Sequence, residues 1–93
     1  MDLRLRSRRA LVTGSSRGIG RAIALWLADL GVDVAINYLR NRTRAEETEA
    51  ELATRGVRCL PLKGNVASPE QVAQMFSSIR SAWGGLEIVV SNP

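Results

Sequence analysis

Apolar and polar positions in this chain follow two periods that alternate from one end to the other. Short, nearly continuous apolar runs predict buried strands, because a strand covered on both faces needs apolar residues at most positions. These runs are residues 10–13, 32–37, 57–62 and 86–90. Between them, apolar residues recur at intervals of three and four, which predicts amphipathic helices. The helical segments are residues 17–30, 43–55 and 69–83.

This alternation of strand and helix is typical of an α/β protein built from βαβ units. Right-handed crossovers in a doubly wound parallel sheet order the strands 3-2-1-4, with helices on both faces. The pattern therefore predicts part of a Rossmann-type sheet, with an open edge at the fourth strand. Pro61 lacks a backbone donor, so the third strand is expected at the other edge.

Local signals mark the ends of the predicted helices. Thr43 with Glu46, and Ser68 with Gln71, have the spacing of a capping box. Pro69 fits the first helical position. A glycine that can adopt a left-handed conformation follows each helix. These glycines are Gly31, Gly56 and Gly84.

The apolar stripes of the first and third helices are expected to pack against the sheet, with Met75 and both tryptophans in the core. The first stripe is Ile19, Ile23, Trp26, Leu27 and Leu30. The second stripe is Val72, Met75, Phe76, Ile79 and Trp83.

The composition fits one small globular domain. The 93 residues are 45% hydrophobic and 24% charged, and no apolar run is long enough to span a membrane. Cys59 is the only cysteine, so no internal disulfide can form, and a reducing cytoplasm is the expected location. The basic residues 1–9 lack the apolar core of a signal peptide and are expected to lead into the first strand. An arginine-rich transit peptide is the alternative interpretation of that segment.

The net charge of +4 comes almost entirely from arginine, with Lys63 as the only lysine. A basic balance is compatible with nucleic acid as a partner. However, the arginines are spread along the chain, and the two tryptophans, one tyrosine and one phenylalanine form no stacking platform. No nucleic-acid partner and no membrane partner is therefore expected. A basic nucleic-acid-binding domain remains as a lower-ranked alternative hypothesis.

Three glycines separate the first strand from the first helix: Gly14, Gly18 and Gly20. Gly14 is expected to let the chain leave the strand in a tight turn, where a side chain would meet a ligand. Gly18 and Gly20 are expected to let a diphosphate and the neighbouring strand approach the first helical turn. The free amides and the positive end of that helix then face an anion. The spacing differs from the phosphate loop of nucleoside triphosphatases, so that class is disfavoured.

The residues between these glycines add further donors. Ser15 and Ser16 are expected to supply hydroxyl groups to the phosphate, and Arg17 a full positive charge. Together the turn predicts a site for the diphosphate of a nucleotide.

Residues 13–20, Thr-Gly-Ser-Ser-Arg-Gly-Ile-Gly, resemble the T-G-x-x-x-G-x-G element of the short-chain dehydrogenase/reductase family. The resemblance extends over nearly the whole chain. Asn65-Val66 matches the family's Asp-Val or Asn-Val pair, and residues 89–93 match an apolar run that ends in N-N-A-G. The resemblance implies that the whole turn, including Ile19, binds a dinucleotide.

The same resemblance implies roles outside the turn. Asn65 would contact the adenine, Val66 the base or ribose, and Asn92 the ribose on the nicotinamide side. Ser91 and Pro93 depart from the family pattern. Proline at 93 removes a backbone donor and so alters the geometry expected at Asn92.

The end of the second strand predicts which dinucleotide binds. An NAD-selective site places a carboxylate there for the ribose hydroxyls, but this chain has Asn37-Tyr38-Leu39-Arg40. The nearest acid, Asp33, lies at the start of that strand and is expected to be solvated. Arg17 and Arg40 are expected to bind a 2′-phosphate from two sides, because guanidinium groups match phosphate oxygens. The sequence therefore predicts NADP(H) in preference to NAD(H).

No catalytic or metal-binding residue is predicted. The family carries a serine and a Tyr-x-x-x-Lys pair in its second half, and the resemblance implies that these are absent from this chain. Tyr38 is the only tyrosine and has Arg42 rather than lysine four residues later. The chain contains no histidine, so a histidine-based triad or metal cluster is excluded.

The resemblance implies that residues 1–93 are the amino-terminal half of one NAD(P)-binding Rossmann domain, with the catalytic half absent. The full-length parent protein would be an NADPH-dependent oxidoreductase. Residues 37–40 and 64–69 resemble the corresponding loops of the 3-oxoacyl and enoyl acyl-carrier-protein reductases of fatty-acid synthesis. The parent's substrate would be a small molecule or be linked to an acyl carrier, and the parent would be a homo-oligomer. The chain alone is expected to be inactive. The alternative is a non-catalytic truncated remnant that binds nucleotide weakly or acts through association.

Overall fold

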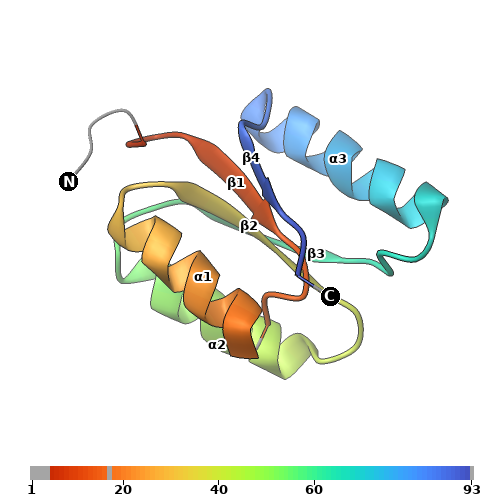
Figure 1. The fold of residues 1–93 in the computed structure, drawn as a ribbon, viewed down its shortest axis with the longest axis horizontal. Helices are drawn as coiled ribbons and strands as arrows, with labels where there is room; N and C mark the ends of the chain where they lie inside the picture. Colours follow the sequence, from red (N-terminus) through yellow and green to blue (C-terminus); the bar gives the residue numbers. More distant parts are fainter. Residues whose placement is uncertain (1–4, 17, 93) are drawn as a thin grey trace.

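The computed structural model describes residues 5–16 and 18–92, which form one parallel sheet with helices on both faces (Figure 1). The strand order is β3-β2-β1-β4, which confirms the predicted doubly wound arrangement. The elements in chain order are β1 (Arg9–Val12), α1 (Gly18–Asp29), β2 (Asp33–Tyr38), α2 (Arg42–Ala53), β3 (Cys59–Lys63), α3 (Pro69–Trp83) and β4 (Ile88–Val90). Each predicted boundary lies within two residues of the observed one, which is the usual uncertainty of helix and strand ends.

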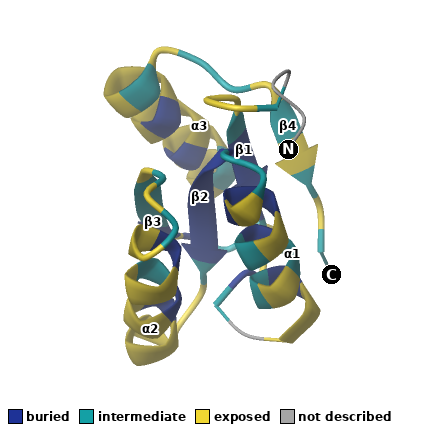
Figure 2. Ribbon diagram, turned by 90° about the vertical axis from the view of Figure 1, so that its left-hand side faces the viewer, coloured by how far each residue is buried: buried dark blue, intermediate teal, exposed yellow. Residues whose placement is uncertain are grey.

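The two central strands are buried on both faces. Helices α1 and α2 cover one face of the sheet, and α3 covers the other (Figure 1). Side chains alternate along β1, so Ala10 and Val12 pack toward α1 and α2 while Leu11 packs toward α3. Burial of both faces explains the continuous apolar runs of β1 and β2, which are dark blue in Figure 2. Pro61 lies on the edge strand β3, as predicted.

The predicted helical stripes are wrong at three large residues. Ile19, Trp26 and Phe76 are exposed, at 73%, 61% and 40% of their surface. The buried line of α1 is rotated from the prediction and consists of Gly20, Ala24, Leu27 and Ala28. Small residues on this line let the helix lie close to the sheet, whereas the prediction followed the largest apolar side chains. In α3, Met75 and Ile79 are buried as predicted.

Two predicted capping boxes are also wrong in part. Asn41, not Thr43, caps α2, because its Oδ1 accepts from Arg44 N at 3.0 Å. Thr43 lies within the helix, where its side chain cannot take that position. Ser68 caps α3 as predicted, with Oγ accepting from Gln71 N at 3.3 Å. Gln71 Oε1 does not close a box and instead accepts from Asn65 N at 2.7 Å.

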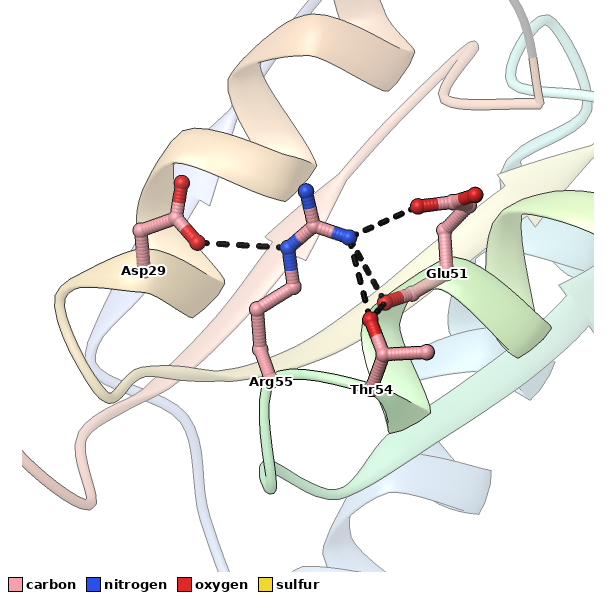
Figure 3. A network of polar contacts seen from close by, with 4 residues as sticks. All are labelled: Asp29, Glu51, Thr54 and Arg55. Atoms are coloured by element: carbon pink, nitrogen blue, oxygen red, sulfur yellow. Dashed lines mark hydrogen bonds and ion pairs between the residues drawn. The ribbon is translucent and has the colours of Figure 1, made fainter.

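Ion pairs cluster at the end of the sheet where the strands begin. Arg55 connects the two helices of one face: its Nε donates to Asp29 Oδ1 of α1 at 3.2 Å, and its Nη1 donates to Glu51 Oε2 of α2 at 2.8 Å (Figure 3). Nη1 also donates to Thr54 Oγ1 at 3.2 Å. Such surface pairs contribute little individually, so they orient the helix ends more than they stabilise the fold.

Arg9 joins β1 to the segment that leads into β4. Its Nε donates to Glu87 Oε1 at 3.1 Å, its Nη2 pairs with Glu87 Oε2, and its Nη1 donates to Trp83 O at 2.7 Å. The Arg9 backbone N also donates to Glu87 Oε1 at 2.8 Å. Hydrogen bonds from the Arg9 side chain, followed by the one from its backbone, lower the pKa of Glu87 to about 2.

The described helices include none with the length and apolar character needed to cross a bilayer. Within the same residues, no cluster of histidine, cysteine, aspartate or glutamate side chains has the arrangement of a metal site.

The lowered pKa of Glu87 predicts a pH-dependent contribution to stability. Its folded pKa of about 2 lies below the ordinary value of 4.5, so the unfolded chain binds this proton more tightly. The contribution is therefore present above pH 4.5 and is lost as the pH falls toward 2. In urea unfolding, Glu87→Gln should lower the free energy of unfolding at pH 7 and approach the wild type near pH 2. Glu47→Gln, on the exposed face of α2, is the control. An equal loss from Glu87→Gln at both pH values would contradict this assignment.

Candidate functional site

An open cleft with a volume of about 840 Å³ lies where the carboxyl ends of the strands meet. The turns that follow all four strands contribute to it. The lining residues are Gly14, Ser16, Gly18, Ile19, Asn37, Tyr38, Leu39, Arg40, Asn41, Gly64, Asn65, Val66 and Asn92. In open α/β sheets, this is the position at which ligands bind.

Two glycines of the first turn, Gly14 and Gly20, are required by the protein's own packing. Gly14 has φ of 61°, and a Cβ atom there would lie 3.1 Å from Asn92 O rather than in the space predicted for a ligand. A Cβ atom at Gly20 would lie only 2.3 Å from Gly14 O. Gly18 has φ of 64° and open space around its missing side chain. The backbone of Gly20 therefore does make a close approach, as predicted, but its neighbour is the Gly14 carbonyl of the same turn.

Ser15 is a correction to the predicted site. Its side chain is fully buried, its Oγ donates to Val12 O at 2.6 Å, and the same Oγ accepts from Asn37 N at 2.9 Å. Its backbone N donates to Asn37 O at 3.1 Å. Both of its donors are thus engaged behind the cleft, so Ser15 fixes the turn and does not present a hydroxyl to a phosphate.

The other described residues of the turn face the cleft. Ser16 is half-buried, and Gly18 and Ile19 are exposed at the start of α1. The amides of a first helical turn have no partner within the helix, and the helix dipole adds positive potential there. An anion can therefore be held at this point. Arg17, predicted to add a charge, lies outside the described residues.

The turn after β3 forms the opposite wall. Asn65 Oδ1 accepts from Ala67 N at 2.9 Å, which leaves the Asn65 Nδ2 group to donate to a ligand. Val66 is 53% exposed and presents an apolar surface suited to one face of a planar base. Both residues line the cleft, so the structure brings together the turn and the Asn65-Val66 pair.

Asn92 closes the cleft beside the first turn. Its Nδ2 donates to Gly14 O at 3.2 Å, and its backbone N donates to Thr13 Oγ1 at 2.9 Å. Thr13 N in turn donates to Val90 O at 3.0 Å. Asn92 thus ties the end of β4 to the end of β1, and its predicted contact with a ribose stays a prediction.

The end of β2 carries the features expected to choose the cofactor. Arg40 is exposed and lines the cleft, and the described lining residues include no carboxylate. The prediction that Asp33 is solvated is wrong. Asp33 is 8% exposed at the opposite end of β2, where it accepts from Arg58 N at 2.8 Å and from Arg58 Nε at 2.9 Å.

Asn37 is the site residue that sequence reasoning missed. Its side chain is 3% exposed, yet it contacts the turns on both sides of the cleft. Oδ1 accepts from Gly14 N at 3.1 Å, and Nδ2 donates to Gly64 O at 3.0 Å. The one available signal was an asparagine inside an otherwise apolar strand, because a buried amide needs partners.

A family model described as short chain dehydrogenase matches residues 8–93, and the chain belongs to this family. A 3-oxoacyl-[acyl-carrier-protein] reductase from Staphylococcus epidermidis is 42% identical over 83 residues, which cover 89% of this chain and 34% of the relative. A short-chain type dehydrogenase/reductase from Picea abies is 46% identical over 94 residues, covering 95% of this chain and 35% of that protein. The chain thus spans about a third of the length of these curated relatives.

Solved structures of relatives share the fold. A short chain dehydrogenase from Burkholderia cenocepacia in complex with NADP superposes with a TM-score of 0.91 at 43% identity, covering 97% of this chain and 37% of the other. An L-sorbose reductase from Gluconobacter frateurii, complexed with NADPH and L-sorbose, has a TM-score of 0.92 at 38% identity. That match covers 99% of this chain and 35% of the reductase.

The different positions of the two serines give a direct test of the turn. Ser15→Ala leaves the buried Asn37 N without its acceptor and should lower the free energy of unfolding by about 1–3 kcal/mol. Ser16→Ala, at the cleft surface, should change it by less than about 0.5 kcal/mol. Urea unfolding of both variants measures the difference. Equal losses from the two substitutions would show that Ser15 has no special structural role.

Proposed function

We propose that this chain binds NADP(H) in the cleft and forms the amino-terminal, dinucleotide-binding part of a short-chain oxidoreductase. The observation that carries this proposal is the arrangement of the first turn of α1 opposite Asn65 and Val66. The amides at the start of α1 suit a diphosphate, and the wall opposite suits a base. The membership of the chain in the family supports a nicotinamide dinucleotide as the ligand.

The preference for NADP(H) over NAD(H) rests on the end of β2. A carboxylate at this position would bind the ribose hydroxyls of NAD and repel a 2′-phosphate. Arg40 lines the cleft instead, and the described lining residues contain no acid that would oppose it. A hydrogen-bonded contact between a guanidinium and a phosphate is worth about 1.5–3 kcal/mol, which is roughly a tenfold to hundredfold gain in affinity.

The chemistry of the parent follows from the cofactor and from the relatives. NADPH, when bound, would supply a hydride to a carbonyl or enoyl carbon, and the protein would bind and orient the reactants. Ser16, Gly18 and Ile19 would hold the diphosphate, Asn65 and Val66 the adenine side, and Asn92 the ribose on the nicotinamide side. The likeness to a 3-oxoacyl-[acyl-carrier-protein] reductase supports an acyl thioester of fatty-acid synthesis as the substrate. We assign no proton donor to this chain, and we expect the pure 93 residues to bind the cofactor without turnover.

Removal of the Arg40 charge tests the cofactor preference. Arg40→Ala should weaken NADPH binding by about tenfold or more, while NADH binding changes little, because only NADPH carries the 2′-phosphate. Fluorescence titration with both cofactors gives the two dissociation constants.

Arg42→Ala is the matched control for this experiment. Arg42 is exposed on α2 and pairs with Glu46 Oε1 at 3.0 Å, outside the cleft lining. Its removal changes the net charge by the same amount, so it should leave the ratio of the two affinities unchanged. Equal affinities for NADPH and NADH in the wild type, or an unchanged ratio in Arg40→Ala, would refute the preference.

A further inference from the structure

Asn37 occupies the position in the sheet from which both walls of the cleft can be reached. It is the fifth residue of β2 (Asp33–Tyr38), which lies between β1 and β3. The turn after β1 therefore lies on one side of it, and the turn after β3 lies on the other. Its backbone N and O are both engaged by Ser15, at 2.9 Å and 3.1 Å. The side chain is thereby held at a fixed point under the cleft.

The side-chain amide of Asn37 bridges the two turns. Its Oδ1 accepts from Gly14 N at 3.1 Å, and its Nδ2 donates to Gly64 O at 3.0 Å and, at 3.4 Å, to Leu62 O. The orientation of the amide is set by chemistry, because a backbone N–H only donates and a carbonyl oxygen only accepts. Aspartate has nearly the volume and shape of asparagine, but it cannot bind both turns in this way because an ionised carboxylate has no proton to donate.

The Gly64 wall is also packed against helix α3, which the Asn37 side chain itself contacts. A Cβ atom at Gly64 would lie 2.9 Å from Met75 Sδ, so the Gly64 backbone packs directly on this side chain of α3. Met75 Sδ lies 3.3 Å from Asn37 Nδ2. Gly64 N donates to Tyr38 O at 2.9 Å. These contacts limit the positions open to Gly64, and the Asn37 bridge connects that wall to the phosphate-side turn.

We propose that Asn37 is a positioning residue that sets the separation between the Gly14 turn and the Gly64–Val66 wall, and thereby the affinity for a ligand that spans both. This inference rests on the proposed dinucleotide function. A ligand that touches both walls binds with full affinity only when the walls are already aligned. Otherwise the free energy needed to align them is subtracted from the binding free energy. A ligand that touches one wall is insensitive to their separation.

The test compares NADPH, which would contact both walls of the cleft, with inorganic pyrophosphate, which would contact only the Gly14 turn. In Asn37→Asp, a carboxylate oxygen still accepts from Gly14 N but faces Gly64 O and Leu62 O without a proton to donate. We expect NADPH to bind about tenfold or more weakly to this variant at pH 8, and inorganic pyrophosphate to weaken less than about threefold. NADPH is titrated by fluorescence, and pyrophosphate by the amide shifts of Ser16, Gly18 and Ile19.

Gln74→Glu is the control for the added charge, since Gln74 is exposed on α3 and lies outside the cleft lining. It adds the same charge without cutting the bridge, so any effect of charge alone appears there. If Asn37→Asp does not fold, Asn37→Ala replaces it. Alanine removes the hydrogen bonds to Gly14 N and Gly64 O without adding charge or volume, and NADPH is again expected to weaken more than pyrophosphate.

The outcomes separate the two proposals. A wild-type chain that fails to bind NADPH refutes the proposed function itself. A wild type that binds NADPH, with Asn37→Asp binding it no more weakly than Gln74→Glu does, overturns the positioning role of Asn37. Equal weakening of NADPH and pyrophosphate in the folded variant also overturns it, because that result indicates general damage to the site.

Discussion

The close approach of α1 to the turn after β1 is the contact on which the cleft depends. A Cβ atom at Gly20 would lie 2.3 Å from Gly14 O, so a side chain there would push the helix away from the strand ends. The Gly14 carbonyl also accepts from Asn92 Nδ2, and the Gly14 amide donates to Asn37 Oδ1. The helix, the neighbouring strand and the segment after β4 thus converge on one residue. Because of this convergence, the first amides of α1 face the cleft.

Charged side chains are distributed differently at the two ends of the sheet. Where the strands begin, acids and arginines neutralise each other in the pairs Arg9–Glu87, Arg58–Asp33 and Arg55–Asp29. Where the strands end, the described lining of the cleft contains Arg40 and no carboxylate. The potential at the cleft is therefore favourable to an anion, although the same chain contains nine acidic residues. The placement of the acids matters more for this than the net charge of +4.

The element order, the strand order and the position of the cleft could be predicted from the sequence, because periodicity and glycine spacing are local properties. Contacts between distant segments could not. Ser15 and Ser16 are identical in type, and only the fold shows that the first is buried against Asn37. Trp26 was misplaced because small residues, not large ones, bring α1 to the sheet. Asp33 acquires its partner Arg58 only through the pairing of β2 with β3.

The most direct test of dinucleotide binding in the cleft is a titration of the isotope-labelled chain with NADPH, followed by the shifts of its backbone amide signals. We predict saturable shifts concentrated at Ser16, Gly18, Ile19 and Val66, with the region around Gly56, at the far end of α2, unchanged. Absence of saturation, or shifts confined to that far end, would contradict it.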